Sequence, residues 1–216
     1  MATTIKIDNA MTEMAVAKGR ISFPCIHKNA EYKGEERNYR QISLILDKDD
    51  AKHAEIITQL RADVKAYRAA AGKAIKNIPI KDGNKINDDI EEGGGEPREE
   101  YVNKVIITIQ GKDGFSIFDG KRNAMQDLAA VEKLFYAGAY ANAIISSTCY
   151  ENDFGVTMNL QLNGIMFGGD GEPFGEATKV ADKSAFDQFE SDDGAGAGAT
   201  GATNDTDTAG EEDDDF

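Results

Sequence analysis

The sequence predicts a mainly β fold, in which a small barrel of about five strands carries one main α-helix and is followed by a disordered acidic tail. Three observations predict this class. Several segments alternate apolar and polar residues with the two-residue period of a half-buried strand. Only one long segment has the three- and four-residue spacing of a helix. Residues 191–216 contain a single apolar side chain larger than Ala, which is too little apolar surface to offset the entropy cost of ordering.

The first two strands are expected at residues 15–25 and 38–47, joined by a polar connection. In the first strand one face is apolar and the other is basic: Ala17, Ile21, Phe23 and Cys25 oppose Lys18, Arg20 and Ser22. In the second strand the two faces hold Ile42, Leu44 and Leu46, and Tyr39, Gln41 and Ser43. We therefore expect the basic face of the first strand to point outward.

The main helix is expected at residues 49–71. Its apolar residues recur at helical spacing: Ile56, Leu60, Val64, Tyr67 and Ala71. Asp49 and Asp50 precede it and Gly72 follows it, which are typical start and stop signals. The next segment, 73–100, contains the run DDIEEGGGEPREE and is interpreted as a long acidic loop inserted in the barrel.

Four further strand segments follow. Strands are expected at 101–110 and 115–118, joined by a hairpin through Gly111-Lys112-Asp113-Gly114, and again at 140–150 and 154–167 around a turn at 151–153. A short helical or irregular piece, 123–134, lies between the two pairs. This count favours a barrel of the oligonucleotide-binding type over residues 1–190, with a β-sandwich as the structural alternative.

Composition limits the class of protein. No apolar run approaches the ~18 residues needed to cross a bilayer, so an integral membrane protein is excluded, and the N-terminal MATTIKIDNAM has no apolar signal core. Cys25 and Cys149 are the two cysteines, so we expect an intracellular, reduced protein, with one disulfide as the alternative.

The net charge of −15 is concentrated in the tail. Seven Asp and two Glu give residues 191–216 a charge of −9, whereas residues 1–190 carry 24 basic against 30 acidic residues. The tail has a Gly/Ala/Thr spacer at 194–201 and ends in five carboxylates before Phe216. It is either a solubilising tail or a short motif whose ring fills a pocket and whose anions meet a basic rim.

Catalysis has little support in the sequence. His27 and His53 have no partners at zinc-ligand spacing, and no nucleophile with a base is evident. The segment GGDGEPFG, 168–175, lacks the Lys-Ser/Thr of a phosphate loop and is interpreted as a turn. Its Asp170 and Glu172 are weak evidence for magnesium, because loop carboxylates are abundant here. We therefore expect no catalytic residue, no metal and no cofactor.

Aromatic and basic residues alternate on or near the polar strand faces. Cations that follow phosphates and rings on which bases stack are what single-strand binding needs. The candidate DNA-binding residues are Lys18, Arg20, Arg37, Tyr39, Arg40, Lys104, Lys112, Phe118, Lys121, Arg122, Tyr140 and Tyr150. The alternative for each tyrosine is half-buried packing.

The C-terminal half carries LFYAGAYANAIISSTCY followed by GVTMNLQLNGIMFGGDGEPFG. Together with the acidic tail ending in Phe, these stretches resemble the phage replication single-stranded DNA-binding proteins of the gene-2.5 type from T-odd phages. The resemblance covers roughly 15–175 in element order and 211–216, and the chain departs from it at Met166, where the family pattern has Gln, and in the acidic insert.

The resemblance implies an oligonucleotide-binding barrel, sequence-independent binding of single-stranded DNA, and a tail that contacts replication proteins. It adds Asn142, beside Tyr140, to the DNA-binding candidates. It assigns partner binding to the tail residues Glu211, Glu212, Asp213, Asp214, Asp215 and Phe216.

The sequence thus predicts a non-enzymatic, single-stranded DNA-binding protein of phage replication or recombination, located in the cytoplasm of a bacterial host. Its expected partners are single-stranded DNA, a polymerase and a helicase/primase, with a homodimer left open and no membrane. The main alternative is an acidic interaction protein, either a DNA mimic or a replisome adaptor without DNA affinity. A metal-dependent nuclease is the third hypothesis for the function.

Overall fold

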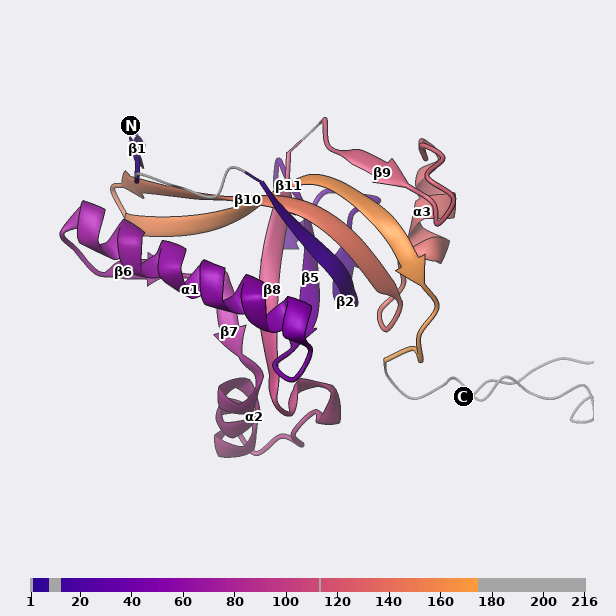
Figure 1. The fold of residues 1–216 in the computed structure, drawn as a ribbon, viewed down its shortest axis with the longest axis horizontal. Coiled ribbons are helices and arrows are strands. Elements are labelled where there is room, and N and C mark those ends of the chain that lie inside the picture. The colour runs from indigo at the N-terminus through magenta and orange to yellow at the C-terminus, as the bar shows by residue number, and fades with distance from the viewer. Residues whose placement is uncertain (1, 8–12, 113, 175–216) are drawn as a thin grey trace, which may run out of the picture. The chain divides into compact units, whose positions relative to one another are not determined.

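The computed structural model describes residues 2–7, 13–112 and 114–174 (Figure 1). Five strands close into a barrel: β2 (Met14–Cys25), β5 (Arg40–Asp47), β8 (Lys104–Gly111), β10 (Tyr140–Asn152) and β11 (Gly155–Gly169). The order around the barrel is β2-β5-β8-β11-β10 and back to β2, and only the β8–β11 pairing is parallel. The predicted mainly β, five-stranded barrel of the oligonucleotide-binding type is confirmed.

Six further strands, three α-helices and a 3-10 turn lie outside the five barrel strands in the described part of the chain. The remaining strands are β1 (Thr3–Ile5), β3 (Glu31–Tyr32), β4 (Glu35–Glu36), β6 (Ile75–Asn77), β7 (Ile80–Asp82) and β9 (Ser116–Phe118). The helices are α1 (Ala51–Ala71), α2 (Gly83–Glu92) and α3 (Leu128–Leu134), with a 3-10 turn, η1 (Glu99–Tyr101). No helix among the described residues is long and apolar enough to span a membrane. The tail, 191–216, and the expected domain boundary at residue 190 lie outside the described residues.

The barrel interior is filled by the residues whose alternation predicted the strands. In β5, Ile42, Leu44 and Leu46 are fully buried, as expected. Helix α1 packs against β2, β5, β10 and β1 (Figure 1). It begins where the Asp50 side chain accepts the His53 backbone N–H at 3.0 Å and ends at Gly72 in the left-handed region. The predicted main helix is confirmed.

A buried polar network holds α1 on β10. The Ser147 hydroxyl donates to Asp63 Oδ2 at 2.5 Å, and the Tyr67 hydroxyl donates to the Ser147 carbonyl at 3.1 Å. Gln59 donates to the other oxygen of Asp63. The network satisfies these buried polar atoms, so it fixes where the helix lies on the sheet.

Strand β2 departs from the alternation predicted for it. Lys18 and Phe23 have φ angles of +50° and +51°, and the pairing register shifts near both positions. Each shift is a bulge that changes which face the following residues occupy. The prediction that Phe23 points inward was therefore wrong, because the residue is 57% exposed.

The hairpin predicted at residues 111–114 was also wrong. Strand β9 does not pair with β8 in the described part of the chain; it pairs in parallel with β11, Ile117 lying opposite Ile165. Strand β11 is 15 residues long, so β8 and β9 pair with successive parts of it.

The segment 73–100 is acidic but is not the expected loop. It contains β6, β7, α2 and most of η1. The Asp82 side chain accepts the Asn84 N–H at the start of α2, and the Asn87 side chain makes two hydrogen bonds with the backbone of Arg98, at 2.9 and 3.0 Å. The prediction failed because the Asp82 cap was not recognised as a helix start. It also failed because Asp82 and Ile86 are held by residues outside the segment, namely Lys48 and the cluster of Ile45, Tyr101 and Ile106.

Candidate nucleic-acid interface

Polar and apolar residues form rows across the outer face of β2, β5 and β8, and the pairing register of the strands decides which residues share a row. Arg20 lies opposite Ile45, and Ile45 lies opposite Ile106. The next row down β5 places Asp47 opposite Lys104. A cleft of about 1050 Å³ lies over this face and is bordered by the first turn of α1 and by the residues after β11. Four predicted residues line it: Lys18, Arg20, Lys104 and Tyr140.

Residues 170–174, here called the strap, cross the edge of this cleft. Arg20 donates to the Glu172 carbonyl at 2.7 Å and to the Gly138 carbonyl at 3.3 Å, and its guanidinium carbon lies 4.2 Å from the centre of the Phe174 ring. Phe174 packs on the cluster of Ile45, Tyr101 and Ile106. Arg20 therefore fastens the strap to the barrel by hydrogen bonds and a cation–π contact.

The strap packs so closely on residue 138 that only glycine fits there. Gly138 has a φ of +107°, and a Cβ atom there would lie 2.1 Å from the Glu172 carbonyl oxygen. On the same side, the Phe174 N–H donates to the Ala137 carbonyl at 3.0 Å, and the Tyr136 hydroxyl donates to the Gly171 carbonyl at 2.9 Å. A side chain at position 138 would thus push the strap off the barrel.

Lys18 is presented to the cleft by its bulge. Its backbone N–H donates to Asn142 Oδ1 at 3.0 Å, so the structure gives Asn142 a positioning contact at the site. His53 braces the same bulge. Its Nδ1 accepts the Asp47 N–H at 3.0 Å, which leaves the proton on Nε2 to donate to the Ala17 carbonyl at 2.7 Å.

The three cations of the cleft are not electrostatically equivalent. Lys104 lies 2.6 Å from Asp47 Oδ2, and its hydrogen bond, followed by one from the Asp49 backbone N–H, lowers the pKa of the Asp47 carboxyl below its ordinary value. Arg20 donates hydrogen bonds to neutral carbonyl oxygens and forms no ion pair with any residue that the structure describes. Lys18 is exposed and has no ion-pair partner among residues 2–7, 13–112 and 114–174.

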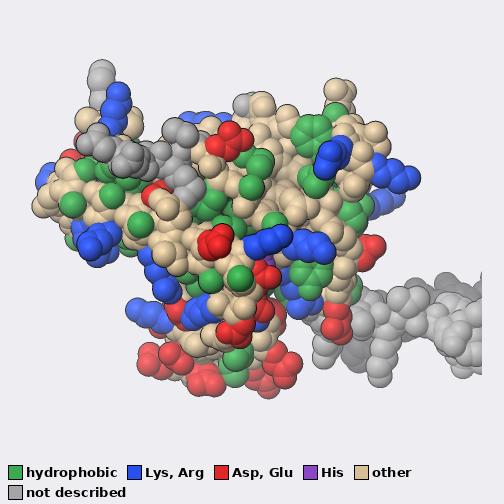
Figure 2. Space-filling model, in the orientation of Figure 1, with side chains coloured by type: hydrophobic (Ala, Val, Ile, Leu, Met, Phe, Trp, Pro, Cys, Tyr) green, Lys and Arg blue, Asp and Glu red, His purple; other side chains and the backbone are tan. Residues whose placement is uncertain are grey.

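Acidic residues also face this cleft. The carboxylates of Asp50, Glu99, Glu100, Asp170 and Glu172 line it together with Asp47. Figure 2 shows a further gathering of acidic side chains at the bottom of the view, over α2, where Asp88, Asp89, Glu91 and Glu92 are exposed. Because these carboxylates repel phosphate and Asp47 pairs with Lys104, anion binding in the cleft depends on Lys18 and Arg20.

The other predicted residues form separate groups. Arg37, Tyr39 and Arg40 lie around the β3–β4 hairpin and the start of β5. The Arg37 guanidinium carbon lies 5.3 Å from the Tyr32 ring centre, and half-buried Arg40 donates to the Ile26 carbonyl at 3.2 Å. Lys112 follows Gly111, which pairs with Arg40.

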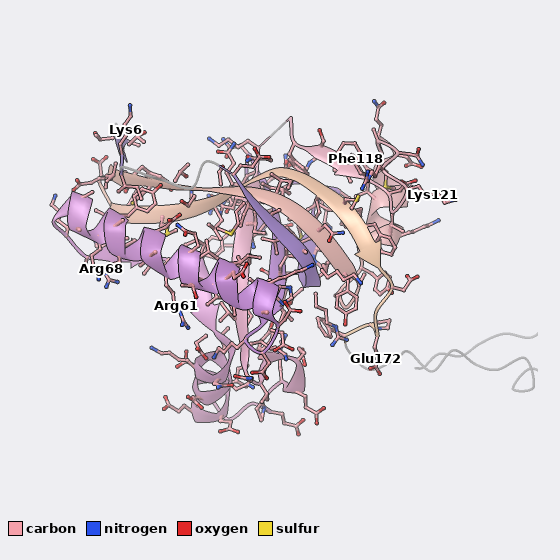
Figure 3. The ribbon with its side chains drawn as sticks, viewed as in Figure 1. Lys6, Arg61, Arg68, Phe118, Lys121 and Glu172 are labelled. Carbon is pink, nitrogen blue, oxygen red and sulfur yellow. The ribbon has the colours of Figure 1, made fainter. Side chains whose placement is uncertain are left out.

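Phe118, Lys121 and Arg122 lie at the far end of β9. Figure 3 shows Phe118 and Lys121 together near α3, apart from Glu172 on the strap. In this turn Asp119 accepts hydrogen bonds from the Asn123 side chain and from the Asn123 and Lys121 backbones, which lower the pKa of its carboxyl.

Tyr150 lies on the half of β10 that pairs with β1, opposite Thr4. The structure thus brings four of the candidates together at one cleft, with Asn142 behind Lys18, and leaves the other eight elsewhere.

Sequence reasoning missed Phe174 and Tyr32. Phe174 belongs to the GGDGEPFG segment, which is interpreted from the sequence as a turn, and an aromatic residue in a glycine-rich segment was the available signal. Tyr32 is 57% exposed at the tip of the β3–β4 hairpin, and the basic residues around it, Lys33 and Arg37, were the signal there.

No group of three or more His, Cys, Asp or Glu side chains within residues 2–174, apart from the gaps at 8–12 and 113, has a metal-binding arrangement. Both cysteines are free thiols, and burial raises the pKa of Cys149.

Comparison with known proteins gives one family. Residues 12–196 match the family model described as the ssDNA-binding protein of Enterobacter phage Enc34. No curated protein sequence matches the chain.

Solved structures share the fold. The single-stranded DNA-binding protein from bacteriophage Enc34 in complex with ssDNA has 21% identity and a TM-score of 0.63, covering 79% of this chain and 96% of that one. The same phage protein in another structure has 22% identity and a TM-score of 0.60, covering 84% and 97%. Bacteriophage T7 gp2.5, a single-stranded DNA-binding protein, has 16% identity and a TM-score of 0.50, covering 87% and 99%.

Proposed function

The chain belongs to the family of the Enterobacter phage Enc34 ssDNA-binding protein, and from this premise we propose that it binds single-stranded DNA without regard to sequence. The observation that carries the proposal is the cleft on the β2-β5-β8 face. It combines the half-buried ring of Tyr140 with two cations, Lys18 and Arg20, that form no ion pair within the described residues. This face of an oligonucleotide-binding barrel is the one that such folds use for oligonucleotides.

The chemistry of the cleft suits recognition of the strand rather than of its sequence. Phosphates are the same at every nucleotide, so Lys18 and Arg20 can bind any strand by releasing its counterions. Every base has an aromatic face, so the Tyr140 ring can stack on any of the four. Binding then proceeds by capture of the phosphates, followed by stacking, and involves no covalent step.

Contacts within the protein hold the cleft in this arrangement in the absence of DNA. Asn142 and His53 hold the two sides of the Lys18 bulge, and the strap holds the Arg20 guanidinium. Since the Lys18 backbone and the Arg20 guanidinium are already held in place, binding costs less conformational entropy than it would on a mobile loop.

A titration of the full-length protein tests the proposal. Fluorescently labelled oligonucleotides, single- and double-stranded, are titrated at two salt concentrations. We expect tighter binding of the single strand, which weakens as salt rises. Absence of binding at low salt would contradict the proposal and would favour the alternative of an acidic interaction protein.

For the tail we propose two roles, both supported by its sequence. Residues 191–216 carry nine carboxylates, and a flexible chain of this length spans ~25–30 Å, from ~5–6 Å per square root of residue number. Such a tethered polyanion competes with DNA for the protein's own cations at an effective concentration of millimolar order. The terminal motif, Glu211 to Phe216, recruits replication proteins such as a polymerase or helicase, with the ring in a pocket and the acids on a basic rim.

Two variants separate these roles. A chain ending at Glu190 should bind DNA more tightly than the full chain, most clearly at low salt. Phe216→Ala should leave DNA affinity nearly unchanged while weakening capture of the polymerase or helicase of the same replication system. Equal DNA affinity with and without the tail would reduce it to a solubilising segment. Undiminished capture by Phe216→Ala would remove the role given to the ring.

A further inference from the structure

Phe23 has a backbone conformation that its residue type disfavours. Its φ of +51° lies in the left-handed region, where glycine is common and a bulky aromatic residue is an outlier. It sits where the register between β2 and β5 shifts, between Ser22 and Cys25, so the bulge turns the ring away from the core. The result is a large apolar side chain that is 57% exposed. Strain of this kind gathers at functional sites, which makes the surroundings of Phe23 informative.

The Phe23 ring lines a second groove, of about 630 Å³. Its walls include Pro24, Pro97, Arg98 and Phe174. The Arg98 guanidinium carbon lies 6.0 Å from the Phe23 ring centre, near the outer limit of a cation–π contact. The groove thus offers an exposed aromatic face with a cation beside it, the two groups that single-strand binding uses.

Arg98 is held in place by hydrogen bonds and ring contacts, and no described carboxylate forms an ion pair with it. The Asn87 side chain clamps its backbone through two hydrogen bonds, and its guanidinium contacts the Tyr101 ring and hydroxyl. The part of the chain that the structure describes contains no ion pair to Arg98. Glu96, Glu99 and Glu100 also line the groove, so the strength of anion binding there depends on this one arginine.

The second groove meets the first cleft. Glu99, Glu100 and Phe174 line both, so the two spaces adjoin at the Phe174 ring. Along β2, Lys18 in the first cleft and Phe23 in the second groove are five residues apart, or about 17 Å at ~3.3 Å per residue. That separation exceeds the length of a single nucleotide.

We infer that the second groove is a further subsite for the same DNA strand, in which the Phe23 ring stacks on a base and Arg98 binds an adjacent phosphate. The inference rests on the proposed function, because it extends the path of the strand from the first cleft past Phe174. Oligonucleotides long enough to reach Phe23 then gain affinity from the second groove, and shorter ones do not.

The absence of Trp from the sequence allows a direct test of stacking. In Phe23→Trp the new side chain is the only Trp, and a stacked base should quench its fluorescence. Phe154→Trp is the matched control. Phe154 is 81% exposed at the turn between β10 and β11, about 40 Å along these strands from Tyr140 at ~3.3 Å per residue.

With saturating single-stranded DNA we expect quenching several times stronger in Phe23→Trp than in Phe154→Trp. An unchanged Phe23→Trp spectrum, while a labelled oligonucleotide reports binding, would overturn the inference.

Phe23→Gly separates stacking from folding, because glycine removes both the ring and the strain at φ +51°. We expect an unchanged or higher melting temperature, and an affinity for oligothymidylates of about 16 nucleotides that is roughly 5- to 150-fold lower. For oligothymidylates of about 4 nucleotides the affinity should stay the same. Arg98→Ala should flatten the slope of log affinity on log salt by about 0.7 with the longer strand only.

The outcomes distinguish failure of the second groove from failure of the proposed function. Equal affinity of wild type and Phe23→Gly at every length overturns the second groove and leaves the first cleft intact. A lower melting temperature of Phe23→Gly, with equal loss at every length, assigns Phe23 to folding and also overturns it. If the wild-type chain binds no single-stranded DNA, the proposed function itself fails.

Discussion

Replacing Asp47 with Asn is expected to tighten DNA binding and to steepen its salt dependence. Asp47 neutralises Lys104 across 2.6 Å, so removing its charge makes a third cation of the cleft available to phosphate. Each phosphate neutralised on a single strand contributes about 0.7 to the slope of log affinity on log salt. Over a fourfold salt range, as from roughly 50 to 200 mM, a slope change of 0.7 multiplies the loss of affinity about 2.6-fold.

Two lysine variants provide the comparison. Lys18 has no ion-pair partner in the described structure, so Lys18→Ala should flatten the slope by about 0.7. Lys104→Ala should change it much less, because the charge of Lys104 is already cancelled by Asp47. Combining Lys18→Ala with Arg20→Ala should flatten the slope by about 1.4, since Arg20 also has no ion-pair partner among the described residues.

The assay is an anisotropy titration of a labelled oligothymidylate at four or more salt concentrations, with circular dichroism to check that each variant is folded. Asn at position 47 keeps an oxygen that can accept the Asp49 N–H, so the turn before α1 should be preserved. The reasoning is refuted if Asp47→Asn leaves the slope unaltered while Lys104→Ala flattens it as much as Lys18→Ala. Lys104 would then contact phosphate despite its ion pair.

Three further predictions concern the Tyr140 ring, the His53 side chain and the Lys48–Asp82 ion pair. Tyr140→Ala should weaken single-strand binding by ~1–3 kcal/mol with an unchanged salt slope. Unfolding by Tyr140→Ala, with Tyr140→Phe neutral in stability and binding, would instead make the ring a packing residue. His53→Ala should lower the free energy of unfolding by ~1–3 kcal/mol in urea, because it strands the Asp47 N–H and the Ala17 carbonyl at a site only 7% exposed. An unchanged urea midpoint would show that water replaces the ring. The Lys48 hydrogen bond, the largest cause, lowers the pKa of Asp82 below 3.8, so this pair stabilises the fold above that pH and ceases to do so as pH falls through the lowered pKa. Lys48→Ala should therefore be less stable than wild type at pH 6 and converge with it in strong acid, and a constant difference at both pH values would exclude the linkage.

Where the chain is regular, the sequence alone predicted the fold. The alternation in β5 identified Ile42, Leu44 and Leu46 as core residues, and all three are fully buried. For α1, the helical spacing of its apolar residues, with Asp50 at its start and Gly72 at its end, was sufficient to predict the helix. Alternation failed in β2, because a left-handed residue at position 18 or 23 changes the phase without leaving a sign in the residue types.

The candidate site could be predicted only in part, for a related reason. Residue types identified Lys18, Arg20, Lys104 and Tyr140, but their grouping follows from pairing between strands far apart in the chain, such as Arg20 with Tyr140. The contribution of Phe174 depends on Gly138, which lets the strap approach, and no local pattern links the two positions. Helix α2 has a local cap at Asp82, but its packing depends on residues outside its segment, such as Lys48, which binds Asp82, and Ile45, on whose cluster Ile86 packs.

The parallel junction of β8 and β11 has a consequence for how the barrel opens and forms. Only two residue pairs join these strands, Ile109 with Leu160 and Gln110 with Gln161, whereas β5 and β8 share eight. The β2-β5-β8 meander and the β10–β11 hairpin each consist of strands that pair antiparallel with their neighbours in the barrel order. The two groups are also joined through β2 and β10, by five residue pairs, so local unfolding that opens the barrel at the β8–β11 junction breaks fewer ladder hydrogen bonds than opening it between β2 and β10. The protein can widen its barrel at this side without disturbing the β2-β5-β8 face that carries the cleft.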